Sequence, residues 1–181
     1  MPNAPEHDHA TYPKIRVFLH WLSACVILWA SITGFFASHL ARHPSVKGFF
    51  DTVNPQVTTL FIPFFGWRLV LYIRSRPWVG WLTLGRQERL AVLVHGALYG
   101  LIILVLASGL LMMPIPWTLL GLFPMPVLGI FCKQLFMLHC YGCIALSCGI
   151  ALHLAAVVYH VARRHNILQK MSFRQSTASN L

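Results

Sequence analysis

Four long apolar runs constrain the fold of this 181-residue chain more than any other feature. They cover about residues 15–40, 54–73, 90–113 and 135–162, and short segments rich in Lys and Arg separate them. A helix needs roughly 20 apolar residues to cross a hydrocarbon core of about 30 Å, and each run meets that length. The chain is also only 10% charged, well below the roughly 25% of soluble domains. We therefore expect an all-α membrane protein, a single domain over residues 1–181 built as a four-transmembrane-helix bundle.

The basic residues predict how the bundle is oriented. Ten of the 14 Lys and Arg residues lie on one side of the four runs, three lie on the other side, and Arg68 lies within the second run. Cytoplasmic loops of membrane proteins carry an excess of Lys and Arg, so both termini are expected in the cytoplasm. The net charge of +10 is also typical of nucleic-acid binding, but here the basic residues flank apolar runs and form no continuous patch. We expect membrane lipid, and not nucleic acid, around the chain.

Prolines and cysteines give three further expectations. Pro55 is expected to open the second run, and Pro63 is expected to kink it. The outer segment 114–133 is apolar and broken by prolines, which predicts an interfacial lid with Trp117 at headgroup depth. The C-x-x-C at 140–143 lies inside an apolar run without a second pair to complete a zinc site, so we expect these thiols to pack as small apolar groups.

Two histidines in the fourth run have a spacing that suits the ligands of two cofactors placed one above the other across the membrane. His139 and His153 are fourteen residues apart, which returns to within about 40° of the same helix face and separates them by about 21 Å along the axis. Ionisable residues inside a membrane helix are costly and usually functional. A single histidine in an apolar run is more often an interior residue whose hydrogen bonds are satisfied by the protein. Here the four runs contain four such histidines, and two of them have the fourteen-residue spacing, which favours haem ligation.

Residues in the cytoplasmic half of the predicted bundle could complete a haem site with His153. His20 lies one turn inside the first run and can meet His153 across one haem, since low-spin haem carriers take two axial ligands. His95 has a similar depth on the third run and could replace His20 or sit beside the haem as a hydrogen-bonding neighbour. Arg68 and His160 are candidates to bind the anionic propionates, or else they extend to the lipid headgroups.

In the opposite, outer half of the predicted bundle, the second run contains no histidine that could pair with His139. The position at the matching depth is Asn54, and an amide oxygen is a poor ligand for haem iron. Three alternatives stay open: His39 or His43 at the end of the first run, the thioether of Met112 or Met113, or no outer haem with a structural His139. The residues therefore predict one inner haem and leave a second one undecided.

These residues and spacings resemble those of a known family. The resemblance rests on Phe18–Leu22 around His20, Trp67–Leu69 around Arg68, His95 with Gly109–Met113, and His139, His153 and His160. On these motifs, from about Lys14 to Met171, the chain resembles the bacterial cytochrome b561 family, which includes the cytochrome b subunits of nickel-iron hydrogenases and formate dehydrogenases. The resemblance implies a bundle in the bacterial inner membrane that holds two b-type haems.

The resemblance also implies ligands and partners. The inner haem would use the positions matching His20 and His153, and the outer haem would use those matching His139 and a second-helix histidine, where this chain has Asn54. Stand-alone family members exchange electrons with ubiquinone, and some oxidise superoxide at the periplasmic face. Other members pass electrons from a periplasmic oxidoreductase subunit to the quinone pool.

Two functions follow as hypotheses. The first is a b-type haem electron carrier that links quinone to a periplasmic donor, either superoxide or a partner subunit. The second is a membrane anchor that docks a catalytic redox partner with one functional haem or none. A small transporter is disfavoured, because the runs carry no acidic residue except Asp51 near an end and show no inverted repeat.

Overall fold

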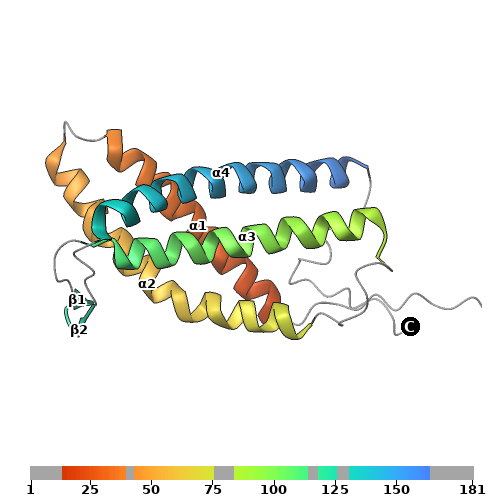
Figure 1. The fold of residues 1–181 in the computed structure, drawn as a ribbon, viewed down its shortest axis with the longest axis horizontal. Helices are drawn as coiled ribbons and strands as arrows, with labels where there is room; N and C mark the ends of the chain where they lie inside the picture. Colours follow the sequence, from red (N-terminus) through yellow and green to blue (C-terminus); the bar gives the residue numbers. More distant parts are fainter. Residues whose placement is uncertain (1–13, 40–42, 76–83, 114–117, 126–130, 164–181) are drawn as a thin grey trace, which may run out of the picture.

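A computed structural model describes residues 14–39, 43–75, 84–113, 118–125 and 131–163 of the chain. Four helices contain most of these residues, and a two-stranded hairpin lies between the third and fourth helices (Figure 1). The helices are α1 (Lys14–His39), α2 (Pro44–Arg74), α3 (Arg86–Leu111) and α4 (Cys132–Ala162), and the strands are β1 (Thr118–Leu119) and β2 (Phe123–Pro124). All four helices are long and apolar enough to cross a membrane, which confirms the predicted fold class.

The helices run up and down, so that helix ends gather at two opposite ends of the bundle. The starts of α1 and α3 lie at the same end as the ends of α2 and α4, and the hairpin lies at the other (Figure 1). We call these the basic end and the hairpin end. Six described Lys and Arg residues belong to the basic end: Lys14, Arg16, Arg74, Arg86, Arg89 and Arg163. Two belong to the hairpin end, Lys47 and Lys133.

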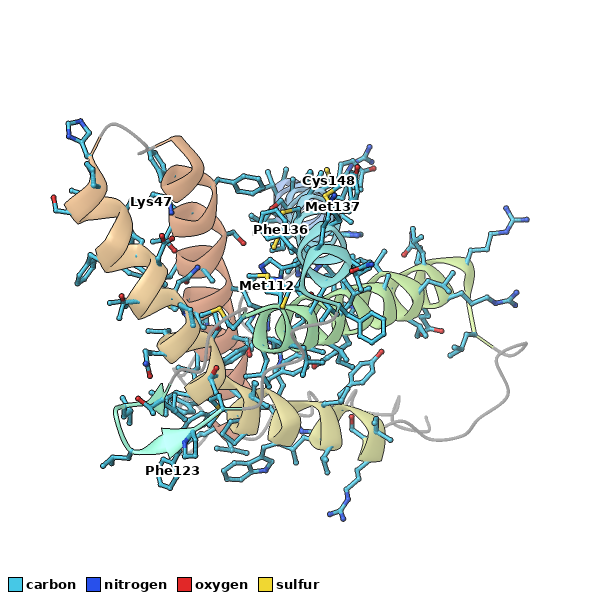
Figure 2. The ribbon with its side chains drawn as sticks, turned by 60° about the vertical axis from the view of Figure 1, so that its left-hand side comes forward. Lys47, Met112, Phe123, Phe136, Met137 and Cys148 are labelled. Atoms are coloured by element: carbon cyan, nitrogen blue, oxygen red, sulfur yellow. The ribbon has the colours of Figure 1, made fainter. Side chains whose placement is uncertain are left out.

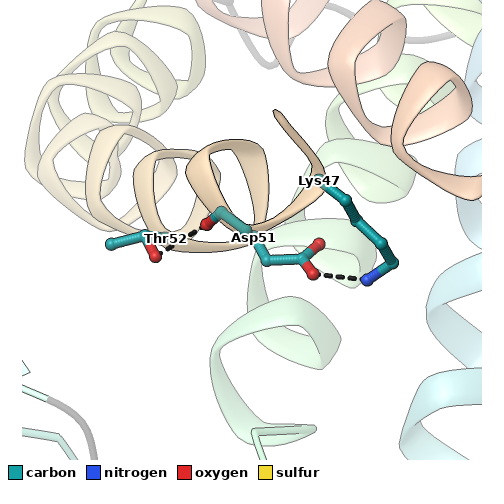
Figure 3. Close-up of polar contacts among 4 residues, drawn as sticks. Lys47, Asp51 and Thr52 are labelled. Carbon is teal, nitrogen blue, oxygen red and sulfur yellow. Dashed lines mark hydrogen bonds and ion pairs between the residues drawn. The ribbon is translucent and has the colours of Figure 1, made fainter. Parts of the chain in front are cut away.

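Helix α2 begins ten residues before the predicted run, and side-chain contacts four residues apart support its first turns. Lys47 forms an ion pair with Asp51, and the Thr52 hydroxyl donates a 2.9 Å hydrogen bond to the Gly48 carbonyl (Figure 3). Pairs spaced three or four residues apart support a helix that hydropathy alone does not detect. The prediction that Pro55 opens this helix is therefore wrong.

Helix α2 is also bent, as Figures 1 and 2 both show. Pro55 and Pro63 lie inside its middle third. A proline inside a helix removes a backbone donor and pushes against the preceding turn, which bends the helix.

The helices pack as two pairs, α1 with α2 and α3 with α4, and α2 makes a smaller contact with α3. Glycines bring α3 and α4 together. A Cβ atom at Gly142 would lie 2.5 Å from the Leu104 side chain, and one at Gly149 would lie 3.1 Å from Leu98. In contrast, α1 and α4 have no comparable contact within the described residues.

The buried core lies at mid-depth, where α2, α3 and α4 meet. It contains Phe61, Phe65, Tyr99, Ile102 and Leu146. Many large apolar side chains face outward instead, among them Phe136 and Met137 of α4, which are about half exposed (Figure 2). Outward apolar side chains on four spanning helices indicate that lipid is the solvent of this surface.

The hairpin is fastened to α2 by one side chain. Gln56 donates a 3.0 Å hydrogen bond to the Thr118 carbonyl and accepts one of 2.8 Å from the Leu120 N–H. Leu120 and Gly121 have positive φ at the turn, and Leu120, Leu122 and Phe123 are exposed at its tip (Figure 2). The described part of the predicted lid is thus a small apolar hairpin, while Trp117 lies outside the described residues.

The contact between α3 and α4 predicts the effect of enlarging Gly142. Gly142→Leu should lower the free energy of unfolding by about 1–3 kcal/mol, because the new side chain must displace Leu104 and Val105. Gly100→Leu is the matched control on α3, since nothing lies within 4 Å of its Cβ position. Thermal unfolding of both purified variants in detergent tests this, and equal midpoints for the two would contradict it.

Candidate functional site

Three of the four predicted haem-ligand candidates lie toward the basic end. His20 is on α1, His95 is on α3 and His153 is on α4, six to nine residues from the basic end of each helix. All three are partly buried. The charges of His95, His153 and Arg68 lie within electrostatic range of the His20 ring. The fold therefore gathers side chains from four helices into one region, which we call the basic-end cluster: His20, Arg68, His95 and His153.

His95 and His153 are direct neighbours across the α3–α4 contact. Their ring centroids are 5.4 Å apart and the rings are nearly perpendicular, at 80°. The His95 Nδ1 lies 2.6 Å from the Ala91 carbonyl. A carbonyl only accepts hydrogen bonds, so His95 Nδ1 carries the proton and donates. The edge-to-face contact holds the orientation of the His153 ring.

Arg68 connects α1 to α3 through the cluster. Its Nη2 lies 3.0 Å from the Nδ1 of His20 and donates to it, since a guanidinium has no acceptor. The same guanidinium lies over the Tyr99 ring, 5.4 Å from the centroid. Tyr99 stacks in turn against Tyr72, with 4.4 Å between ring centroids. Arg68 therefore contacts one residue of α1 and one of α3.

Arg16 is a second cation of this region and was missed as a site residue in the sequence. Its Nε is buried without a hydrogen-bond partner among the described residues. It is one helical turn from His20, and its charge lies within electrostatic range of the Tyr99 hydroxyl. The four-residue spacing from His20 was the available signal in the sequence, where Arg16 is one of the ten basic residues on the same side of the apolar runs.

Neither arginine has a carboxylate partner in the part of the chain that the structure describes. The one ion pair there joins Lys47 to Asp51 at the hairpin end. The other described acid, Glu88, accepts a 3.0 Å hydrogen bond from the Gly85 N–H at the start of α3. The basic-end cluster is consequently cationic, and it suits an anionic group supplied from outside the chain.

His139 is locked onto α3 near the hairpin end. Its Nδ1 lies 3.1 Å from the Val105 carbonyl and 3.2 Å from the Ser108 hydroxyl, and its Nε2 lies 3.5 Å from the Cys143 sulfur. A Cβ atom at Gly109 would come within 3.0 Å of the ring. Both ring nitrogens thus have protein neighbours, of which sequence reasoning identified none.

Asn54 faces a different helix from His139. Its Oδ1 accepts a 3.3 Å hydrogen bond from the Thr33 hydroxyl of α1. His43, an alternative partner for His139, is the exposed N-cap residue of α2. Met112, another alternative, is the C-cap residue of α3, and Met113 follows it. The His39 side chain lies outside the described residues.

Other predicted positions add little to the site. His160 lies two turns beyond His153 at the basic end, with its ring 5.7 Å from that of Tyr159. No group of three or more His, Cys, Asp or Glu side chains that could hold a metal ion is found within the described ranges. The segment 78–81, in which two tryptophans make a candidate quinone-binding segment on the side of the basic end, lies outside them.

Comparison with known proteins identifies the family. A model of the prokaryotic cytochrome b561 family matches residues 11–174, nearly the whole chain. No curated protein matches the chain. The chain belongs to the prokaryotic cytochrome b561 family, as its motifs predicted, and it is a multi-pass membrane protein that transfers electrons with b-type haem.

The residues of the basic-end cluster fit such a haem by their chemistry. A b-type haem takes imidazole nitrogens on its iron and carries two carboxylates. The cluster combines three imidazoles with a partly buried guanidinium, and Arg16 adds a second guanidinium whose buried Nε has no hydrogen-bond partner among the described residues. At the hairpin end, the His139 imidazole already contacts α3.

Proposed function

Because the chain is a prokaryotic cytochrome b561, we propose that His20 and His153 are the axial ligands of a b-type haem near the basic end. The observation that carries this proposal is the unequal packing of the helices. α3 and α4 touch through glycines, whereas α1 and α4, which carry His20 and His153, do not pack closely within the described residues.

The packing distinguishes between His20 and His95 as partner of His153. Gly149 lies one turn from His153, and its Cβ position is only 3.1 Å from Leu98, which lies one turn from His95. A macrocycle between these two helices would have to displace that contact, and well-packed helices resist such insertion. His95 therefore acts as a neighbour that orients the His153 ring, through the contact at 5.4 Å.

Each protein group of the site has a distinct part. When bound, the haem supplies a one-electron carrier whose potential depends on its ligands, hydrogen bonds and burial. Phe65 and Tyr99 of the core beside Arg68 exclude water from this region. An imidazole bound to iron through Nε2 keeps its proton on Nδ1, so the Arg68 guanidinium, which here donates to His20 Nδ1, would turn to a propionate when haem binds. His160 lies at the same end and could donate to the propionates as well.

We further propose that the chain binds one haem and not two. His139 and Asn54, the pair expected at the hairpin end, are held by different helices, α3 and α1 respectively. The Asn54 amide is also a poor iron ligand. His139 then has a structural role, joining α4 to the Val105 carbonyl of α3.

In its cellular setting, we propose that the protein exchanges electrons with ubiquinone or another quinone in the bacterial inner membrane. The excess of Lys and Arg at the basic end supports placing that end, and both termini, in the cytoplasm. With a single haem near the basic end, a periplasmic donor, either superoxide or an oxidoreductase subunit, would exchange electrons with this haem through the quinone, which can diffuse in the membrane between the two ends of the bundle.

The hairpin supports a second candidate function, a membrane anchor for a catalytic redox subunit. Its exposed Leu120, Leu122 and Phe123 are held at a fixed place by Gln56. An apolar tip at a span end suits a docked protein as well as lipid. Co-purification of a partner at fixed stoichiometry would favour this function, and rapid quinone reduction by the isolated chain would favour the first.

The ligand assignment predicts different results for the three histidines. His20→Ala and His153→Ala should each abolish the Soret band and the b-type bands of the reduced-minus-oxidised spectrum, because each removes an axial ligand. His95→Ala should keep most of the haem and shift its midpoint potential, because it removes only a neighbour of His153. A haem loss in His95→Ala as complete as in His20→Ala would contradict the assignment. Absence of Soret absorbance from the folded wild-type protein would overturn the function itself.

The one-haem proposal predicts that an added imidazole at residue 54 does not create a second site. The wild-type protein should give about one haem per chain in a pyridine haemochrome assay. Asn54→His should keep that ratio, because His139 stays bonded to the Val105 carbonyl of α3. Asn54→Leu is the control and should give the same ratio. A clear rise in haem content in Asn54→His, with a second component in a redox titration, would contradict the structural role of His139, and a wild-type ratio of two would contradict the single haem.

A further inference from the structure

Arg16 is a partly buried cation that the proposed ligands do not account for. It lies on α1 one turn from His20 and on the same face, since residues four apart on a helix are neighbours. Its Nε has no hydrogen-bond partner among the described residues, although the atom is shielded from solvent. A buried donor without a partner is costly, and few such groups occur in native proteins.

The surroundings of Arg16 contain cations and aromatic rings and lack a described carboxylate. Arg16 and Arg68 both lie within electrostatic range of the Tyr99 hydroxyl, and Arg68 covers the Tyr99 ring. The two described acids are engaged elsewhere, Asp51 with Lys47 and Glu88 with the Gly85 N–H. Two partly buried guanidiniums near one tyrosine therefore require an anion that the described chain does not provide.

We propose that Arg16 binds a propionate of the haem and forms, together with Arg68, a two-arginine clamp for its two carboxylates. The proposal rests on the proposed function, since it takes the haem to lie between His20 and His153. Arginine suits this part because its planar fork can donate two hydrogen bonds to one carboxylate. The clamp orients the macrocycle with its carboxylate edge toward the basic end.

A lipid phosphate is the other anion with the same chemistry, and burial argues against it. Lipid headgroups reach the exposed cations of the basic end, such as Lys14 and Arg74. The Arg16 Nε is instead enclosed by protein, and the Tyr99 beside it belongs to the buried core. A carboxylate on a group bound inside the bundle can reach the Arg16 Nε while this atom stays shielded from solvent.

The test compares Arg16→Gln, Arg16→Lys and Arg74→Gln in the haem-loaded protein. Arg74 lies at the same end of the bundle but is exposed, so Arg74→Gln controls for a general loss of charge. Three quantities are measured in nanodiscs of zwitterionic lipid and again with anionic lipid. They are the rate of haem transfer to apomyoglobin, the propionate-bending bands in resonance Raman spectra, and the haem midpoint potential.

Arg16→Gln should lose haem roughly ten- to hundredfold faster than the wild type, as expected for one lost charge-assisted hydrogen bond. Its propionate-bending bands should shift, and its midpoint potential should fall, because an uncompensated carboxylate disfavours the added electron. Arg16→Lys should recover part of all three effects, and Arg74→Gln should match the wild type. The effects should be equal in both lipids.

Two results would overturn the proposal while leaving the proposed function intact. One is an Arg16→Gln protein with wild-type propionate bands and midpoint potential. The other is an effect that appears only in anionic lipid, which would assign Arg16 to a phosphate headgroup. If Arg16→Gln fails to fold, the Arg16→Lys variant tests the proposal instead. Wild-type propionate-bending bands in Arg16→Lys would exclude a bidentate contact between Arg16 and the propionate. A haem-free wild type would instead refute the function.

Discussion

The close packing of α3 against α4 is the contact on which the rest of the site depends. Gly142 and Gly149 remove the side chains that would hold these helices apart, and Leu104 and Leu98 fill the space. This contact brings His153 beside His95, and it leaves α1 as the helix from which a second ligand can approach. In a bilayer, helices associate chiefly through such close packing, since lipid is as apolar as the helix surfaces.

Charge in the bundle is distributed as unevenly as packing. The sequence has 14 Lys and Arg against four acids, and the one ion pair among the described residues lies at the hairpin end. Arg68 is stabilised by the Tyr99 ring and the His20 nitrogen, which replace a carboxylate only in part. A protein that binds an anionic cofactor inside the membrane benefits from such an excess, because the cofactor neutralises it on binding.

The hairpin end differs in every respect. Asn54 bonds to α1, His139 bonds to α3, and Gln56 holds the hairpin against α2. These contacts are polar and local, and each satisfies its own donor or acceptor. These contacts stabilise the hairpin end of the bundle, and the proposed haem site lies at the other end.

The sequence by itself determined the four spans, the family and the candidate imidazoles, because span length and the fourteen-residue spacing of His139 and His153 are properties of single helices. It could not determine that α2 starts at Pro44, since that segment is held by polar pairs. Only the tertiary structure decided that His153 meets His95, that Asn54 and His139 turn to different helices, and that the Arg16 Nε is shielded from solvent within electrostatic range of Tyr99. The physical reason is that periodicity places a side chain on a face of its own helix, whereas the rotation and approach of neighbouring helices depend on packing between residues far apart in the chain.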